Sequence, residues 1–163
     1  MHTTTVPPLL RTLGALDSIL AKTESHCEAQ GIDPMALLNF RLFPDMLPFT
    51  RQIQLACDFA ARMGARLSGA EVPSFPDVET TIPELRARIA AARDYLASLP
   101  ASGFDGAAER QITIKTRVGD MTMDGVQFQM QYAFPQVYFH AATAYNILRH
   151  NGVPLGKRDF MGA

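Results

Sequence analysis

Apolar residues recur at intervals of three and four along four stretches of the chain, which is the pattern of amphipathic helices. The stretches cover residues 5–27, 49–67, 82–99 and 124–150. The last would form a rod of roughly 40 Å at the usual helical rise. A short extra helix is predicted over Met35–Asn39, because Asp33-Pro34 is typical of an N-cap followed by proline. The pattern predicts an all-α four-helix bundle.

Glycines, prolines and capping residues mark the helix ends. Gly31 breaks the pattern of the first helix, and Ser68-Gly69 is expected to end the second. Pro7 and Pro8 are expected in the first turn of the first helix, where their missing N–H groups would have no partner. Thr81 and Glu84 have the spacing of a capping box at the start of the third long helix. The segment 70–80 contains two prolines, and we expect those prolines to order it.

The only segment with the sequence pattern of β-strands precedes the last helix. Residues 111–117 and 121–123 alternate apolar and polar, and Gly119-Asp120 has the composition of a two-residue hairpin turn. We predict a small β-hairpin that closes one end of the bundle. Asp124 is expected to cap the last helix, with Gln127 at the capping-box position.

The last helix carries one polar stripe on an otherwise apolar surface. Steps of three and four place its members on a common face: Gln129, Tyr132, Gln136, His140 and Thr143. Such a stripe either lines an internal pocket or is satisfied within the core. Pro135 lies in the same helix, and we expect it to kink the helix and free a backbone carbonyl near Gln136 and His140.

Length, charge and hydropathy argue against several classes of function. A chain of 163 residues with 15 basic and 16 acidic side chains predicts a single domain without the basic field that nucleic acids require. No run of eighteen apolar residues could span a bilayer, and the first residues do not resemble a signal peptide. We therefore expect a cytoplasmic protein that binds neither nucleic acid nor membrane. Cys27 and Cys57 are expected to be free thiols.

Three of the four histidines have a simple structural explanation. His2 is expected in a frayed terminus, and His26 and His150 lie near helix C-termini, where a cation is favourable. His140 differs, because it lies mid-helix among aromatic residues. It is either a hydrogen-bonded core residue or a ligand-binding one.

A metal site at His140 would have few ligands. Zinc or nickel usually takes three protein ligands, often including two histidines one turn apart. Here that pair would be Gln136 and His140, and Asp45 or Gln52, seven residues apart in the second long helix, could add an oxygen ligand. The phosphate-binding loops, the GxSxG motif and the HExxH motif are all absent from the sequence.

Charged residues elsewhere are expected on the surface. Arg51 and Asp58 lie in the second long helix, and we place Asp58 on its solvated face. The tail, residues 153–162, mixes apolar and charged residues, so it is expected to pack on the bundle or on a second subunit.

Three segments resemble a bacterial domain-of-unknown-function family within the DinB/YfiT-like superfamily of metalloenzymes. They are LFPDMLPFTRQIQLACDFA (42–60), PSFPDVETTIPEL (73–85) and YFHAATAYNILRHNGVPLGKRDFMG (138–162). The resemblance implies an up-down-down-up four-helix bundle that often forms homodimers. It also implies a divalent metal held by one histidine of the second helix and two histidines, four apart, of the fourth. His140 matches the second of that pair, whereas Gln136 occupies the first position and residues 45–67 contain no histidine.

Two functional hypotheses follow. In the first, the bundle lacks a metal, and a pocket of Asp45, Gln52, Tyr132, Gln136 and His140 binds a small organic ligand or fixes the core. In the second, His140 with Asp45 or Gln52 holds zinc or nickel for a metal-dependent hydrolase or transferase reaction. The first needs no cofactor and is the one we favour.

Overall fold

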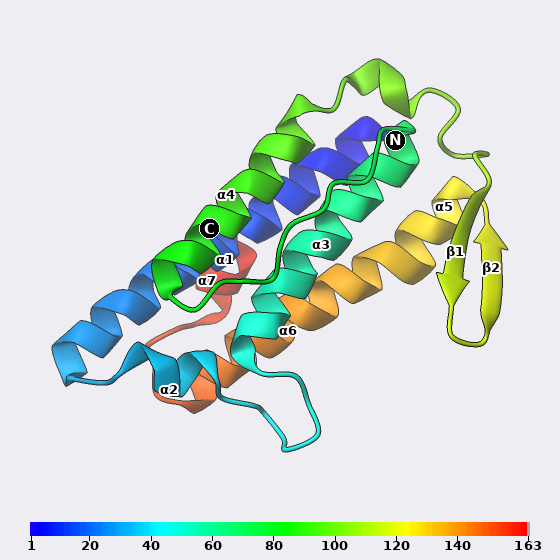
Figure 1. Ribbon diagram of the computed structural model, residues 1–163. Coiled ribbons are helices and arrows are strands. Elements are labelled where there is room, and N and C mark those ends of the chain that lie inside the picture. The colour runs from blue at the N-terminus through cyan, green and yellow to red at the C-terminus, as the bar shows by residue number, and fades with distance from the viewer. Residues whose placement is uncertain (163) are drawn as a thin grey trace.

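The structure is a computed structural model that describes residues 1–162, and it is mostly helical. Four long helices lie side by side: α1 (His2–Gln30), α3 (Phe49–Ser68), α4 (Ile82–Ser98) and α6 (Phe134–His150) (Figure 1). The shorter helices are α2 (Pro34–Leu38), α5 (Gly125–Gln127) and α7 (Lys157–Met161), with a 3-10 turn η1 (Ala101–Phe104). The prediction of a mostly helical fold with a small antiparallel hairpin is thus confirmed.

Helix α3 is the centre of the packing, because it contacts α6, α4 and α1. Its apolar face is fully buried and includes Phe49, Ile53, Met63 and Leu67. Small side chains between these let neighbouring helices approach closely. At Gly64 an added Cβ would lie 2.6 Å from Leu96 Cδ2 and 2.8 Å from Leu99 Cδ1.

Replacing Gly64 with alanine should therefore destabilise the protein by about 1–2 kcal/mol, because overpacking at α4 outweighs the gain in helix propensity. Gly14→Ala is the matched control, since the nearest atom to its added Cβ is 3.8 Å away. That substitution should stabilise by about 0.5–1 kcal/mol. Urea denaturation of both variants measures the difference, and a stabilising Gly64→Ala would refute the close approach.

Several predicted helix ends are confirmed. Gly31 and Gly69 end α1 and α3 in the left-handed conformation, with φ of 64° and 75°. Asp33 caps α2 through its carboxylate. Both predicted capping boxes form, one at the start of α4 and the other at the start of α5.

The start of α1 was predicted wrongly. The helix begins at His2, so Pro7 and Pro8 lie in its interior. His2 is part of the helix and its ring contacts Phe104, so it is not frayed. Because Pro8 has no N–H, the carbonyl of Thr4 has no i→i−4 partner within the helix.

The side chain of Gln129 satisfies that carbonyl. Its Nε2 donates to the Thr4 carbonyl at 3.2 Å and to the Thr5 hydroxyl at 2.7 Å. Gln129 is buried, so this member of the polar stripe is satisfied within the core. The amide thus compensates for a proline inside α1.

Gln129→Leu should cost about 1–3 kcal/mol, because it leaves a buried carbonyl and hydroxyl without that donor. The variant Pro8→Ala supplies the missing N–H and should lessen this cost in the double mutant. A double-mutant cycle by urea denaturation measures the coupling, and strict additivity would contradict the assigned role of Gln129.

The predicted hairpin forms, but its turn lies two residues earlier than expected. Strands β1 (Ile112–Thr116) and β2 (Gly119–Met123) pair with Thr116 opposite Gly119 and Lys115 opposite Asp120. The turn residues are therefore Arg117-Val118, and Gly119, with φ of 125°, begins β2. The alternation places Ile112 and Ile114 against the core. The hairpin stands beside α5 at one end of the molecule (Figure 1).

Pro135 is accommodated by a π-helical segment, η2 (Phe128–Ala133), directly before α6. The N–H of Phe134 donates to the carbonyl of Gln129, five residues back. The carbonyl that Pro135 leaves free in an α-helix is four residues earlier, at Gln131. The expectation of a free carbonyl near Gln136 and His140 was therefore wrong, because proline acts on the preceding turn.

The tail packs back over the bundle. Helix α7 contacts α1, where Lys22 forms an ion pair with Asp159, and Phe160 meets Tyr145 edge to face. Within residues 1–162, the helices are all too short or too polar to cross a membrane.

Candidate functional site

His140 and Gln52 form a buried hydrogen-bonded pair between α6 and α3. The distance from His140 Nδ1 to Gln52 Oε1 is 2.8 Å. Gln52 Nε2 donates to the carbonyl of Leu47, at the entry to α3, at 2.9 Å. His140 is 7% exposed and Gln52 is 1% exposed, so both are held inside the fold.

These two hydrogen bonds determine which nitrogen of the His140 imidazole carries the proton. Since Gln52 uses its NH₂ group for the Leu47 carbonyl, its oxygen faces the imidazole, and His140 Nδ1 must be the donor. Nε2 of His140 then carries the lone pair. It has no hydrogen-bond partner within residues 1–162.

Nε2 also remains in contact with solvent. Among the side-chain nitrogens and oxygens of residues 1–162, only the Nε of Arg88 is both shielded from solvent and without a hydrogen-bond partner. Because Nε2 of His140 also lacks a partner, it must keep some exposure to solvent. The imidazole therefore presents an oriented acceptor to the outside while its other nitrogen is fixed in the core.

The surroundings keep His140 neutral. Its ring stacks on Phe59, with centroids 5.6 Å apart and planes at 8°, and meets Phe139 edge to face at 5.2 Å. Burial, aided by the positive charge of Arg51, lowers the pKa of His140 from 6.5 to about 4. At neutral pH the imidazole is therefore an acceptor and not a cation.

The structure brings together some of the predicted site residues. Tyr132 lies against the Phe59 ring that stacks on His140, with centroids 6.4 Å apart. Gln136 is half-buried one turn before His140. Asp45 is exposed in the turn before α3. The expectation that Asp45 shares a helix face with Gln52 was wrong, because α3 begins only at Phe49, after Pro48.

The donor set around His140 does not fit the divalent metal that the DinB-like resemblance implies. Its Nδ1 is committed to Gln52, and the residues one turn away and across on α3 are amides. No three His, Cys, Asp or Glu side chains in residues 1–162 are grouped so that they could share an ion. Neutral amides are weak ligands for zinc or nickel, so we derive no metal-dependent step.

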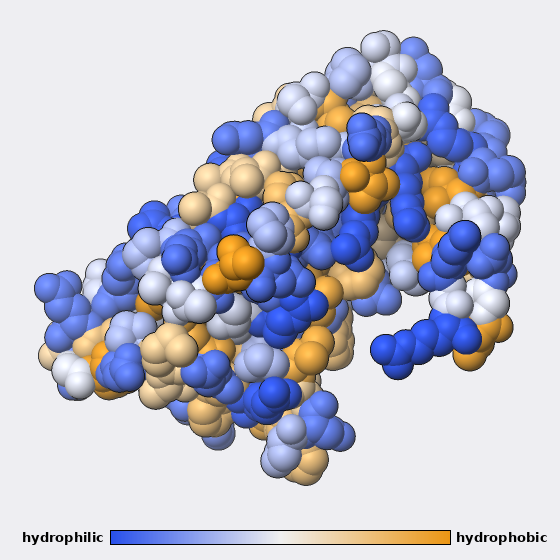
Figure 2. Space-filling model, in the orientation of Figure 1, coloured by the Kyte–Doolittle hydropathy of each residue, from blue (hydrophilic) through white to orange (hydrophobic). Residues whose placement is uncertain are grey.

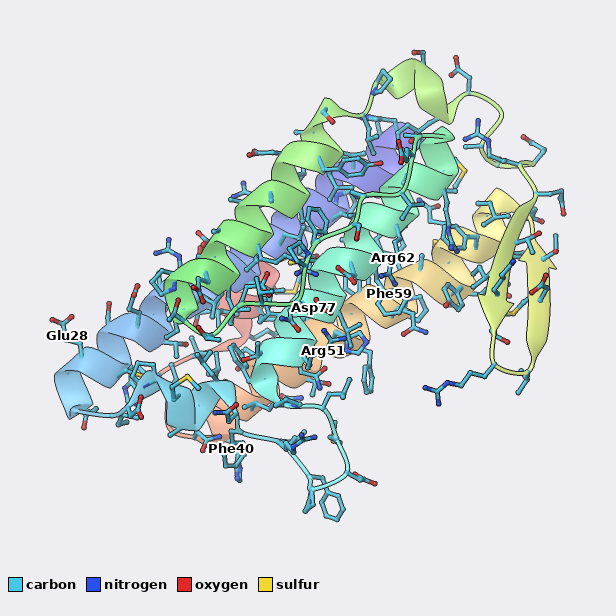
Figure 3. The ribbon with its side chains drawn as sticks, viewed as in Figure 1. Glu28, Phe40, Arg51, Phe59, Arg62 and Asp77 are labelled. Atoms are coloured by element: carbon cyan, nitrogen blue, oxygen red, sulfur yellow. The ribbon has the colours of Figure 1, made fainter. Side chains whose placement is uncertain are left out.

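A small cleft lies next to Phe59, and neither His140 nor Gln52 lines it directly. It has a volume of about 180 Å³ and lies between α3, β1 and η2, with Phe59 and Tyr132 in its wall. Figure 3 shows Phe59 and Arg62 projecting from α3 toward α6. The space-filling view shows the same face of the molecule hollowed between the hairpin and the segment before α3 (Figure 2). Phe59 thus joins the His140–Gln52 pair to the cleft.

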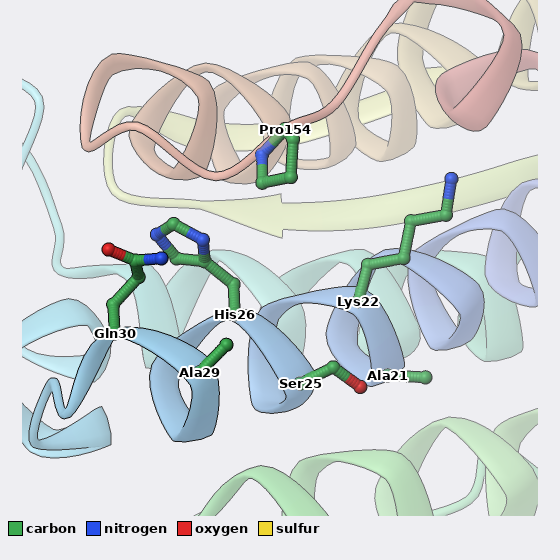
Figure 4. A pocket seen from close by; sticks show the side chains of 7 residues that line it. All are labelled: Ala21, Lys22, Ser25, His26, Ala29, Gln30 and Pro154. Atoms are coloured by element: carbon green, nitrogen blue, oxygen red, sulfur yellow. The ribbon is translucent and has the colours of Figure 1, made fainter.

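A larger groove of about 620 Å³ lies along α1 near its C-terminal end (Figure 4). Its lining residues are Ala21, Lys22, Ser25, His26, Ala29, Gln30 and Pro154. Apart from His26 it has no aromatic wall, and Lys22 is already paired with Asp159. We therefore place the candidate site at the smaller cleft.

A buried ion network was missed by the sequence patterns. Arg88 of α4 is 4% exposed and donates to Asp58 at 2.5 Å, to Glu79 at 2.9 Å and to the Pro76 carbonyl at 3.0 Å. Its guanidinium lies 5.0 Å from the Phe75 ring. The network, and not proline stiffness alone, fastens the segment 70–81 along α3 and α4.

Asp58 was wrongly assigned to a solvated face. Its carboxylate also accepts from Arg62 at 2.8 Å, so it is shared between two arginines. Arg51 pairs with Asp77, and the two side chains lie together beside α3 (Figure 3). Arg51 and Asp77 are 26 residues apart in sequence, and Asp58 and Arg88 are 30 apart, so helical spacing could not reveal these two pairs.

The cysteines are structural. Cys27 and Cys57 are both buried and free. Burial raises the pKa of the Cys57 thiol to about 12. Neither is a candidate nucleophile, because the reactive form of cysteine is the thiolate.

Comparisons with known proteins agree with this fold. The chain matches the family described as "Domain of unknown function (DUF1993)" over residues 1–161. It is similar to the crystal structure of a DinB family member protein from Shewanella denitrificans, with 41% identity and a TM-score of 0.94. That match covers 99% of this chain and 92% of the other. Curated proteins gave no match. The chain therefore belongs to the DUF1993 family, whose fold is DinB-like.

Proposed function

We propose that this protein binds a small organic molecule, without a metal ion, in the aromatic cleft between α3, β1 and η2, beside the Phe59 ring that stacks on His140. The observation that carries the proposal is the free, solvent-contacting Nε2 of a neutral histidine whose other nitrogen is fixed by Gln52. A ligand hydroxyl or N–H can donate to this atom. Binding should cost little side-chain entropy at His140, because Gln52 already fixes the orientation of the imidazole ring.

The volume of the cleft limits the size of the ligand. At about 180 Å³ it is smaller than the roughly 300 Å³ at which sites for drug-sized molecules begin. The ring faces of Phe59 and Tyr132 favour a flat or aromatic group. Tyr132 supplies the wall, Gln52 positions the imidazole, and His140 accepts from the ligand, while Gln136 extends the same face of α6.

A fragment screen by ligand-observed NMR tests the proposal. Uncharged aromatic fragments with one hydroxyl or amide should bind at millimolar concentration and shift the ¹⁵N resonance of His140 Nε2. Tyr132→Ala should abolish these hits. Tyr138→Ala is the matched control, because Tyr138 is exposed on α6 and stacks on Phe134, away from the cleft. If no hit depends on Tyr132, the pair is only a core hydrogen bond and the proposal is wrong.

The alternative is a DinB-like metal-dependent hydrolase or transferase that uses Nε2 of His140 as one ligand. Elemental analysis of protein purified without a histidine tag separates the two. Near-stoichiometric zinc, nickel or iron that is lost in His140→Ala would overturn the metal-free proposal. A thermal midpoint unchanged by added divalent ions would count against the alternative, because a bound ion stabilises the folded state.

We also propose the up-down-down-up helix order and the homodimer that the family resemblance implies. The packing of α1 against both α4 and α3 supports the helix order. Sedimentation equilibrium tests the dimer, and a single monomer mass at high concentration would exclude it.

A further inference from the structure

The cleft beside Phe59 contains three cationic side chains and no acidic one. They are Arg62 and Arg66 of α3 and Lys115 of β1. The whole chain has a net charge of −1, so this local excess is not a reflection of a basic protein.

Arg62 is accounted for by its neighbours. It donates to Asp58 at 2.8 Å, and its guanidinium lies 5.9 Å from the Phe59 ring. Its role is to link the ion network to the wall of the cleft.

Arg66 and Lys115 have no such partner. Neither side chain forms a hydrogen bond or ion pair with another residue of the described range 1–162. Arg66 is half-buried in the last turn of α3, where the helix dipole favours a cation. Lys115 is exposed on β1, and the side chain of its register partner Asp120 forms no ion pair with it. The dipole therefore explains one of the two cations at most.

Of the two cations without a partner, Lys115 is exposed and Arg66 is half-buried, so the uncompensated charge that costs most is that of Arg66. Arg62 and Arg66 are four residues apart on one helix, a spacing at which like charges repel. A half-buried guanidinium also loses part of its hydration. An oxyanion in the cleft would relieve both effects, because carboxylates and phosphates form charge-assisted hydrogen bonds with arginine and lysine.

Resting on the proposed function, we infer that the ligand is a small aromatic acid. Its carboxylate or phosphate contacts Arg66 and Lys115, and its ring lies against Phe59, Phe128 and Tyr132. These aromatic side chains line the same cleft as the two cations.

Titration calorimetry with four probes tests this assignment: benzoate, phenyl phosphate, benzamide and inorganic phosphate. At low salt one of the two aromatic anions should bind at millimolar concentration or better, and which of them binds more tightly identifies the anionic group. Benzamide should bind about tenfold more weakly, because it lacks the charge. Added salt should weaken anion binding.

Two charge-removing variants locate the site. Arg66→Gln and Lys115→Gln should each weaken binding of the tighter aromatic anion about tenfold. Arg158→Gln and Lys157→Gln remove the same charges on α7 and should leave binding unchanged.

Each of the other possible results of these titrations would overturn a specific part of the inference. Equal binding of benzamide and benzoate would refute the anionic class while leaving the proposed function intact. Equal binding of inorganic phosphate and phenyl phosphate would refute the aromatic part. If uncharged fragments bind through Tyr132 and no anion does, this inference alone fails. If neither class of probe binds, both proposals fail.

Discussion

Replacing Arg88 with methionine should lower the free energy of unfolding by about 3–5 kcal/mol, as expected when one partner of a buried ion network is removed. The side chain of Arg88 is 2% exposed, and its partners Asp58 and Glu79 are 13% and 9% exposed. Without the guanidinium these carboxylates would stay buried without their main counter-charge. Urea denaturation at neutral pH measures the loss.

Arg86→Met is the matched control, because Arg86 lies on the same helix in a surface ion pair. Its side chain is 38% exposed and pairs with Asp17 at 2.8 Å. Exposed pairs contribute about 0–1 kcal/mol. Limited proteolysis adds a structural readout, since segment 70–81 should become cleavable only in Arg88→Met. Similar losses in the two variants would show that the network does not hold the segment.

Acidification should destabilise the protein through His140. Its pKa is about 4 in the folded state and 6.5 in the unfolded chain. The unfolded state therefore binds the proton first, and stability falls as the pH drops below 6.5 and levels off below about 4. The expected loss is about 2 kcal/mol between about pH 7 and pH 5, and about 3 kcal/mol in all.

Urea denaturation at a series of pH values, compared between the natural protein and His140→Asn, isolates this contribution. The variant lacks the titrating group, so the difference between the two curves should follow a single proton. An unchanged pH profile in His140→Asn would mean that the imidazole is not held neutral by burial. The carboxylates are common to both proteins and cancel in the comparison.

Local sequence signals predicted the helix ends well. The capping boxes at Thr81 and Asp124 and the glycine at position 31 act within a few residues, so their effect can be read from spacing. The start of α1 was missed because Met1 provides no side-chain cap and two prolines follow. The carbonyl that Pro8 leaves without an N–H partner is satisfied by a distant residue, Gln129, which spacing within α1 cannot reveal.

The candidate site was predicted in part. His140 and Gln52 were both named as site residues, and the structure joins them by a hydrogen bond. The cations Arg66 and Lys115 were not named, because they come from a helix and a strand that meet only in the folded protein. The same reason applies to Arg88, whose carboxylate partners lie in α3 and in the segment 70–81.

The π-helical segment before Pro135 has a geometric consequence for the polar residues on either side. On an unbroken α-helix, Gln129 and His140 would lie within about 20° of each other, because eleven steps of 100° nearly complete three turns. One extra residue per turn shifts the angular phase by about 100°. Gln129 accordingly meets Thr4 and Thr5 of α1, whereas His140 meets Gln52 of α3. Because of this offset, the same continuous helical segment contacts two neighbouring helices. Gln129 donates to the Thr4 carbonyl of α1, and His140 is oriented by Gln52 of α3.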